Sequence, residues 1–262
     1  MGILNVTPDS FSDGGRYLDT RQAIRRGQQI EEEGADIIDV GGESTRPGAE
    51  TVDTAEEINR VIPVIEALSS SSSLPISIDT RKSEVASRAL AAGASIINDV
   101  SGLTYDSTMP LVAENSGAGV IIMHMQGAPR TMQKQPRYDD VLTEILDWLE
   151  CRAGQLEESG IERDRIALDP GIGFGKTLEH NLKLLAGVKA LGNAGRPVVI
   201  GASRKSSLGR ITGRETNDRL AASLAVLAFC VMNGAHIMRV HDVKESRDVV
   251  ETLTAIDKYK EQ

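Results

Sequence analysis

Aromatic residues and cysteines are scarce in this sequence. Phe, Trp and Tyr make up 3% of the 262 residues, so the core must be built mainly from Val, Ile, Leu and Ala. Such a core is typical of parallel strands that are buried on both faces. The two cysteines, Cys151 and Cys230, lie far apart in the chain and form neither a disulfide framework nor a CxxC metal motif. The scarcity favours an α/β core held by aliphatic packing.

The chain also lacks an excess of positive charge and a long hydrophobic run. Its net charge of -9 opposes attraction to nucleic acids and to anionic membrane surfaces. No run approaches the roughly 20 apolar residues of a membrane span, and no charged segment followed by an apolar stretch opens the chain. We therefore expect a cytoplasmic protein with no nucleic-acid partner and no membrane partner.

A short apolar run that ends in polar residues occurs eight times along the chain. Parallel strands whose carboxyl ends meet at one active site give this pattern. The eight segments are GILNVTPDS, ADIIDVGGEST, PISIDTRK, SIINDVSG, GVIIMHMQG, RIALDPGIGFGK, PVVIGASRK and HIMRVHDV.

Helix-length amphipathic segments alternate with these runs. They cover residues 20–33, 55–68, 82–92, 107–116, 138–159, 178–191, 217–233 and 244–258. Eight βα units in one chain of this length predict a single (β/α)8 TIM barrel over residues 1–262, whereas a doubly wound sheet has fewer units. We expect long mobile loops after strands 1 and 2, and a flexible loop at Ser69–Ser73.

The segment DPGIGFGKT nearly fits the phosphate-binding loop GxxxxGK[ST]. The first glycine of that motif falls on Pro170, however, and proline lacks the N–H and the dihedral freedom that a phosphate cradle needs. We therefore expect the glycines to pass close beneath a flat ligand, with Asp169 accepting hydrogen bonds from it.

Acidic residues follow several of the predicted strands. Asp79 and Asp169 terminate apolar runs and should project into the barrel mouth, which favours functional roles. A lone Asp after a strand is more often a helix N-cap or a loop anchor than a catalytic group, and this explanation suffices for Asp99 and Asp242. For His124, the sequence has no second ligand at metal spacing, so we expect a hydrogen-bonding role in its loop.

Basic residues also gather after the strands of this acidic chain. They are Arg46, Arg204, Lys205, Arg239 and His241. Arg239 and His241 lie two residues apart, which places both on one side of a strand. The grouping predicts an anionic substrate with a phosphate or pyrophosphate subsite.

Taken together, the eight motifs resemble those of dihydropteroate synthases, and the resemblance extends from Met1 to about Lys258. It implies a TIM-barrel transferase of folate biosynthesis, which joins 6-hydroxymethyl-7,8-dihydropterin pyrophosphate to p-aminobenzoate and releases pyrophosphate. In this family the reaction is similar to an SN1 displacement through a pterin cation, and p-aminobenzoate is mimicked by sulfonamides. The family also implies a homodimer built through the last helices.

The resemblance implies a role for each matching residue. The catalytic residues would be Asp79, Lys205, Arg239 and His241. The pterin would contact Asp79, Asn98, Met123, Asp169, Phe174 and Lys205, while pyrophosphate would contact Arg46, Arg239 and His241. The p-aminobenzoate site would be Phe11, Thr45, Pro47 and Ser206, and Asn5 would be the Mg²⁺ contact.

Two other functions remain open from the sequence. A methyltransferase that moves a methyl group from methyltetrahydrofolate to a corrinoid would share the pterin-facing aspartate and asparagine, but it has no pyrophosphate to hold. A catalytically silent pterin-binding homologue would differ only in turnover. The basic residues named above disfavour the first. The second is disfavoured by five residues that match the family: Asn5, Asp79, Lys205, Arg239 and His241.

Overall fold

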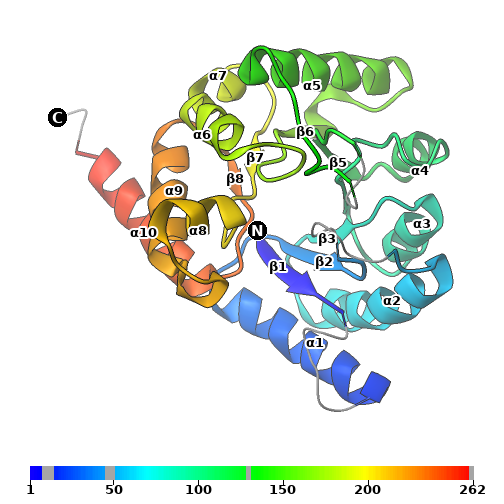
Figure 1. Cartoon of the computed structure of the whole chain (residues 1–262). Coiled ribbons are helices and arrows are strands. Elements are labelled where there is room, and N and C mark those ends of the chain that lie inside the picture. The colour runs from blue at the N-terminus through cyan, green and yellow to red at the C-terminus, as the bar shows by residue number, and fades with distance from the viewer. Residues whose placement is uncertain (8–14, 45–50, 128–130, 260–262) are drawn as a thin grey trace.

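The computed structural model describes residues 1–7, 15–44, 51–127 and 131–259, and it is built around a ring of parallel strands (Figure 1). Six strands pair in chain order: β1 (Gly2–Asn5), β2 (Ile38–Gly41), β3 (Ile76–Asp79), β4 (Ile96–Asp99), β5 (Gly119–Met123) and β6 (Ile166–Asp169). β7 (Val199–Ile200) and β8 (Ile237–Met238) form a second, shorter ladder.

Two isolated bridges close the ring. Leu168 of β6 pairs with Val198, and Gly2 of β1 pairs with Val240. The Leu168 N–H donates to the carbonyl of Pro197 at 2.8 Å, and the Val240 N–H donates to that of Met1 at 3.0 Å. The predicted TIM barrel is therefore confirmed, although its closure rests on few backbone hydrogen bonds.

Helices surround the strands on the outside of the ring (Figure 1). They are α1 (Gly15–Glu32), α2 (Thr54–Ser71), α3 (Ser83–Ala91), α4 (Met109–Ser116), α5 (Val141–Glu158), α6 (Leu178–Ala186), α7 (Val188–Gly192), α8 (Ser206–Thr212), α9 (Leu220–Met232) and α10 (Val243–Asp257). None of the described helices is both long and apolar enough to cross a membrane.

Three helical details differ from the sequence expectation. The predicted flexible loop at Ser69–Ser73 is wrong, because α2 continues to Ser71 and the hydroxyls of Ser70 and Ser71 donate to carbonyls one turn back, at 2.8 and 2.9 Å. The single helix expected over 178–191 is divided at Gly187, where an added Cβ would meet a methyl of Leu142 at 2.6 Å. The short helix α8 was not expected.

The barrel interior changes from apolar to polar along its axis. Met1, Ile121, Ala167 and Val199 form a buried cluster, against which Ile37, Ile96 and Ile237 pack. Side chains two residues further along a strand point to the same side. From these positions the two-residue period leads to Asp39, Asn98, Met123, Asp169 and Arg239, so the apolar plug at the base is followed by a polar layer at the carboxyl ends of the strands.

Candidate active site

The polar layer begins with acceptor side chains on β2, β3, β4 and β6. Asp39, Asp79, Asn98 and Asp169 are all buried, with 0%, 8%, 5% and 5% of their surface exposed. The strand register sets Asp79 beside Asn98. Since carboxylates at this depth need partners, their surroundings decide what the site can bind. We call these four residues the acceptor side.

Arg239, just after β8, supplies the partner for two of these carboxylates. Its Nε donates to Asp39 Oδ2 at 2.6 Å and its Nη2 donates to Asp79 Oδ2 at 2.7 Å. The Asn98 Nδ2 donates to the same oxygen of Asp39 at 3.2 Å. The Arg239 guanidinium therefore links the end of β8 to β2 and β3, across the junction with β1 at which the barrel closes.

Asp39 is the member of this group that the sequence interpretation missed. The signal was present, because Asp39 is an acid inside the apolar run DIIDV, two residues after Ile37 and hence on the same inward side. A buried carboxylate at an inward position predicts a cation opposite it, and Arg239 is that cation.

The electrostatics of Asp79 are unusual. Burial raises its pKa to about 7, opposed by Arg239 and reinforced by the nearby charges of Asp39, Glu57 and Asp99. Asp79 Oδ1 is buried and has no hydrogen-bond partner within the described part of the chain. An unsatisfied buried acceptor is costly, and a ligand N–H or a cationic ligand at this position would relieve that cost.

A second group of residues forms around Asp169. The Asp169 Oδ1 accepts from the Gly171 N–H at 2.7 Å, and burial raises the Asp169 pKa. The Lys205 ammonium lies 4.1 Å from the centre of the Phe174 ring. Burial lowers the pKa of Lys205 to about 8, although the Asp169 charge opposes this shift. Met123 is 4% exposed and pairs in register with Asp169. A carboxylate, an ammonium and an aromatic ring thus converge beside the Asp79 group.

The glycine-rich loop after β6 is pressed against the end of β5. Gly171 has φ +69°, and a Cβ on it would lie 2.0 Å from the carbonyl oxygen of His124. Lys176, which gives the loop its likeness to a phosphate-binding motif, is 3% exposed and donates from Nζ to the carbonyls of His124 at 3.2 Å and Phe174 at 2.9 Å. Because the Lys176 ammonium donates to these protein carbonyls, we exclude it as a binding group for the phosphate of a nucleotide.

The structure confirms a hydrogen-bonding role for His124. Its Nδ1 lies 3.2 Å from Lys176 Nζ, and burial together with the Lys176 charge lowers the His124 pKa to about 3. The imidazole is therefore neutral, and its Nδ1 accepts from the ammonium.

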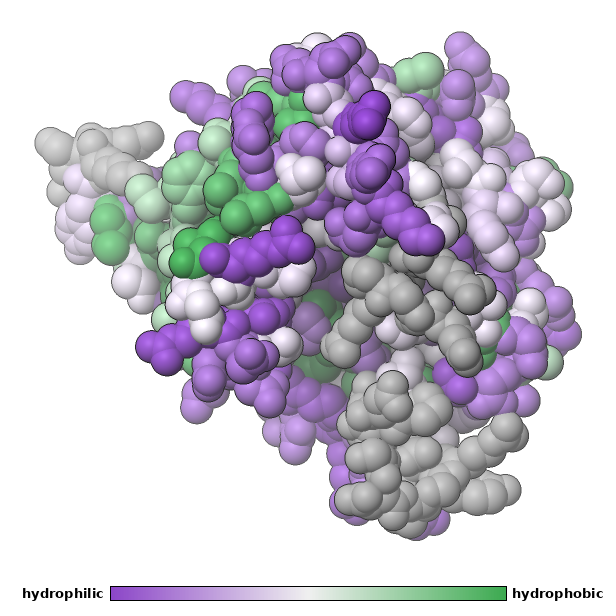
Figure 2. Space-filling model, in the orientation of Figure 1, coloured by the Kyte–Doolittle hydropathy of each residue, from purple (hydrophilic) through white to green (hydrophobic). Residues whose placement is uncertain are grey.

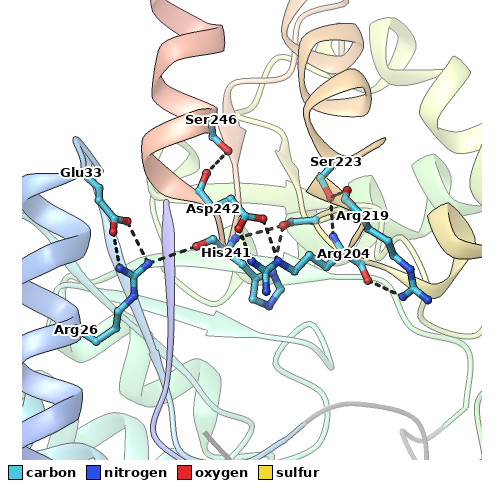
Figure 3. A network of polar contacts seen from close by, with 9 residues as sticks. Arg26, Glu33, Arg204, Arg219, Ser223, His241, Asp242 and Ser246 are labelled. Carbon is cyan, nitrogen blue, oxygen red and sulfur yellow. Dashed lines mark hydrogen bonds and ion pairs between the residues drawn. The ribbon is translucent and has the colours of Figure 1, made fainter. Parts of the chain in front are cut away.

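His241 belongs to a polar network at the rim, drawn in Figure 3. Its Nδ1 lies 3.1 Å from Ser203 Oγ, and its N–H donates to the same oxygen at 3.3 Å. Asp242 occupies the N-cap position of α10 without capping it, since its carboxylate pairs with Arg204 instead. Asp99 is a loop anchor, accepting from the Ser101 N–H at 2.7 Å.

The remaining candidate residues divide into two sets. Asn5 is the last residue of β1, beside Gly41 of β2, and Ser206 is the first residue of α8. Phe11, Thr45, Arg46 and Pro47 lie outside the described residues. The described part of the site therefore opposes acceptors on β2, β3, β4 and β6 with two cations, Lys205 after β7 and Arg239 after β8. Together with the imidazole of His241 we call these residues the cation side.

Opposed acceptors and cations suit a polar ligand that carries an anionic group. Comparison with known proteins gives the family of the chain. The family model described as "Pterin binding enzyme" matches residues 1–241. Dihydropteroate synthase of Escherichia coli (strain K12) is 46% identical over 255 residues, which cover 97% of this chain and 90% of the relative.

Solved structures give the same result. The Yersinia pestis dihydropteroate synthase, in complex with a sulfonamide drug, has a TM-score of 0.93 and 42% identity, covering 98% of this chain and 94% of that one. The Xanthomonas albilineans enzyme with 4-aminobenzoic acid has a TM-score of 0.93 and 44% identity, covering 98% and 92%. The chain belongs to the pterin-binding enzymes and, among these, to the dihydropteroate synthase family.

Proposed function

We propose that this protein is a transferase that condenses 6-hydroxymethyl-7,8-dihydropterin pyrophosphate with p-aminobenzoate to give 7,8-dihydropteroate and pyrophosphate. The observation that carries the proposal is the opposition of buried acceptors and partly buried cations at one barrel mouth, joined by the contact of Arg239 with Asp79 at 2.7 Å. Family membership supplies the reaction, and this opposition supplies a physical reason for it.

The pterin ring is the ligand that the inner part of the mouth suits best. The amide and 2-amino groups of a pterin edge are donors that match the Asp169 carboxylate and the Asn98 amide oxygen. The Lys205 ammonium would face the ring carbonyl, while Met123 and Phe174 would pack on the ring faces. The Oδ1 of Asp79, which has no hydrogen-bond partner among the described residues, would accept from a further pterin N–H or face the ring when it becomes positive.

Charge separation is the step that this arrangement favours. When the bond between the pterin methylene carbon and the pyrophosphate oxygen breaks, the ring becomes positive and the leaving group takes the electron pair. The amino nitrogen of p-aminobenzoate then bonds to the methylene carbon and releases one proton to solvent. Asp79 faces the developing cation and Arg239 with His241 faces the developing anion, so catalysis is mainly electrostatic. No strong base is required.

Magnesium is the cofactor we infer for the pyrophosphate. Within the described residues, no group of three or more His, Cys, Asp or Glu side chains could hold a metal ion. A Mg²⁺ held by one side-chain oxygen, phosphate oxygens and water is consistent with that donor set, and the carboxamide oxygen of Asn5 would be the side-chain contact. When bound, the ion neutralises charge on the leaving group. Arg46 would add a further cation.

The p-aminobenzoate site would combine Ser206, at the start of α8, with Phe11, Thr45 and Pro47. Support comes from the relatives that carry 4-aminobenzoic acid or a sulfonamide drug in their solved structures. We therefore expect sulfonamides to compete with p-aminobenzoate for this chain.

We further infer a homodimer of single-domain subunits. Figure 2 shows apolar surface gathered mainly over α9. Phe229 and Met232 of α9 are 46% and 62% exposed, and a surface of this kind is typical of a protein interface. Light scattering should give twice the subunit mass, and Met232→Glu should shift the population toward the monomer.

The test of the proposed function is direct. The purified chain is mixed with dihydropterin pyrophosphate, p-aminobenzoate and Mg²⁺, and dihydropteroate is measured by chromatography. Product that depends on both substrates and falls with added sulfonamide supports the proposal. Methyl transfer from methyltetrahydrofolate to a corrinoid would support the rival methyltransferase, and pterin binding without turnover would support the silent homologue.

A further inference from the structure

Arg204 has a backbone conformation that is unusual for its residue type. Its φ is +56°, in the left-handed region that a residue with a Cβ enters at a cost. Arg204 stands between Ser203, which contacts His241, and Lys205, which lies over Phe174. Strain of this kind persists where the surroundings hold it, and it clusters at functional sites.

Both the backbone and the guanidinium of Arg204 have polar partners, which Figure 3 shows. Its Nε donates to Asp242 Oδ2 at 3.0 Å, and its Nη2 contacts the other carboxylate oxygen, so the pair is bidentate. Its N–H donates to Ser223 Oγ at 3.0 Å, and its carbonyl accepts from Arg219 Nη1 at 3.1 Å. α9 and the start of α10 thereby fix both the backbone and the side chain.

The position of this contact matters because the β7–β8 ladder is short. The register pairs only Val199 with Ile237 and Ile200 with Met238, and the next backbone bond runs from the Arg239 N–H to the Ile200 carbonyl at 3.0 Å. Beyond that bond, side-chain contacts connect the two segments. The contacts that the structure describes there are the Arg204–Asp242 pair and the Ser203–His241 contact.

We propose that Arg204 is a positioning residue of the active site, which acts through Asp242 to fix Lys205 and His241 relative to one another. The inference rests on the proposed function. Lys205 follows Arg204 directly and His241 precedes Asp242 directly, so the ion pair links the residues next to Lys205 and His241. Electrostatic catalysis requires fixed charges, and a displacement of about 1 Å costs on the order of 100-fold in rate.

The Arg204–Asp242 pair differs from an ordinary surface ion pair in its lower exposure and in its bidentate contact. The Arg204 and Asp242 side chains are 33% and 13% exposed, whereas the Arg247–Asp36 pair is 33% and 74% exposed and makes a single close contact of 2.8 Å. Arg247 therefore offers a matched arginine of equal exposure outside the proposed site. Its loss should leave turnover unchanged.

The experiment compares Arg204→Met, Arg204→Gly and Asp242→Asn with the control Arg247→Met. Measured quantities are kcat, both KM values, the unfolding temperature, and the Kd of inorganic pyrophosphate with Mg²⁺ by calorimetry. We expect Arg204→Met and Asp242→Asn each to lower kcat about 30-fold and to weaken pyrophosphate binding about 10-fold. Arg204→Lys should recover part of the turnover, since a lysine keeps the charge without the fork.

Arg204→Gly separates the backbone from the side chain. Glycine adopts a positive φ without strain, so this variant should unfold at a temperature no lower than Arg204→Met and still lose the same turnover. Wild-type kcat in Arg204→Gly or in Asp242→Asn, with changes in the unfolding temperature alone, would overturn the positioning role. If the unaltered chain makes no dihydropteroate, the proposed function fails instead, while pyrophosphate calorimetry on the same variants still tests the positioning.

Discussion

The two arcs of the barrel differ in both strand length and charge. Strands β1 to β6 form a continuous ladder of four- and five-residue strands, whereas β7 and β8 have two residues each and close the ring through single bridges. The long arc carries the acceptor side, Asp39, Asp79, Asn98 and Asp169. The short arc carries the cation side, Lys205, Arg239 and His241.

This difference has a physical basis. On regular strands a two-residue period brings acceptor side chains to one depth at the mouth. After β7 the chain leaves the ladder early, so backbone turns and ion pairs such as Arg204–Asp242 orient the cations. In this site the acceptors are therefore placed by regular strands, and the cations by turns and ion pairs.

Arg239→Met should have the largest effect, because this guanidinium joins the two arcs. Its removal leaves Asp39 and Asp79 buried without their cation, which should cost about 3 kcal/mol of unfolding free energy and about 1000-fold in kcat/KM. Urea unfolding and steady-state kinetics measure these losses. Arg239→Lys is the control, and full recovery by lysine would refute a requirement for the forked contact with two carboxylates.

Asp79→Asn should lower turnover more than binding. The substitution keeps the shape and removes the charge that faces the pterin cation, so we expect kcat to fall about 100-fold while the Kd of the pterin substrate changes less than about 10-fold. Equal losses in the two quantities would indicate that Asp79 serves ground-state binding only.

Gly171→Ala should be moderately destabilising and should weaken pterin binding. An added Cβ meets the His124 carbonyl at 2.0 Å, at φ +69°. Gly117 is a matched control, because it has φ +70° and no atom within 4 Å of an added Cβ. We expect Gly117→Ala to cost about 1 kcal/mol and Gly171→Ala about 2 kcal/mol more. Equal unfolding free energies for the two variants would show that the loop does not need this close approach.

Lys176→Met should have the smallest effect, seen in the pH dependence of stability. Burial lowers the pKa of Lys176 to about 7 from an ordinary 10.5. Between these values the unfolded chain binds more protons than the native protein, so stability rises with pH from about 7 to about 10. The variant should lose part of this rise, the remainder coming from Lys205. An unchanged slope in urea unfolding would contradict the lowered pKa.

Much of the fold and part of the site could be predicted from the sequence. The eight apolar runs are a strong signal because each buried strand is short and is followed by polar residues. Asp79 and Asp169 could be assigned to the mouth because they end such runs. Asp39 was missed because it lies inside an apolar run. Its inward direction follows only from the alternation of side chains along β2, which the register with β3 establishes.

Other features depend on contacts that no local pattern encodes. The serine run continues α2 in place of the expected flexible loop, and the hydroxyl of Ser69 donates to the distant carbonyl of Ala92 at 2.9 Å. The strained φ of Arg204 depends on α9 and α10, which follow it in the chain. The inward direction of Lys176 depends on the carbonyl of His124, just after β5, and on that of Phe174 in the glycine-rich loop.

A double-mutant cycle between Asp79 and Arg239 tests the central claim most directly. The claim is that the two arcs act as one charge-separating unit, whose contact is the 2.7 Å bond between Arg239 Nη2 and Asp79 Oδ2. The measurement is kcat/KM for the pterin substrate in dihydropteroate formation by the unaltered chain, Asp79→Asn, Arg239→Met and the double variant. We predict that the double variant is no slower than Arg239→Met alone, within about 3-fold. Losses that multiply to about 100,000-fold would contradict the account.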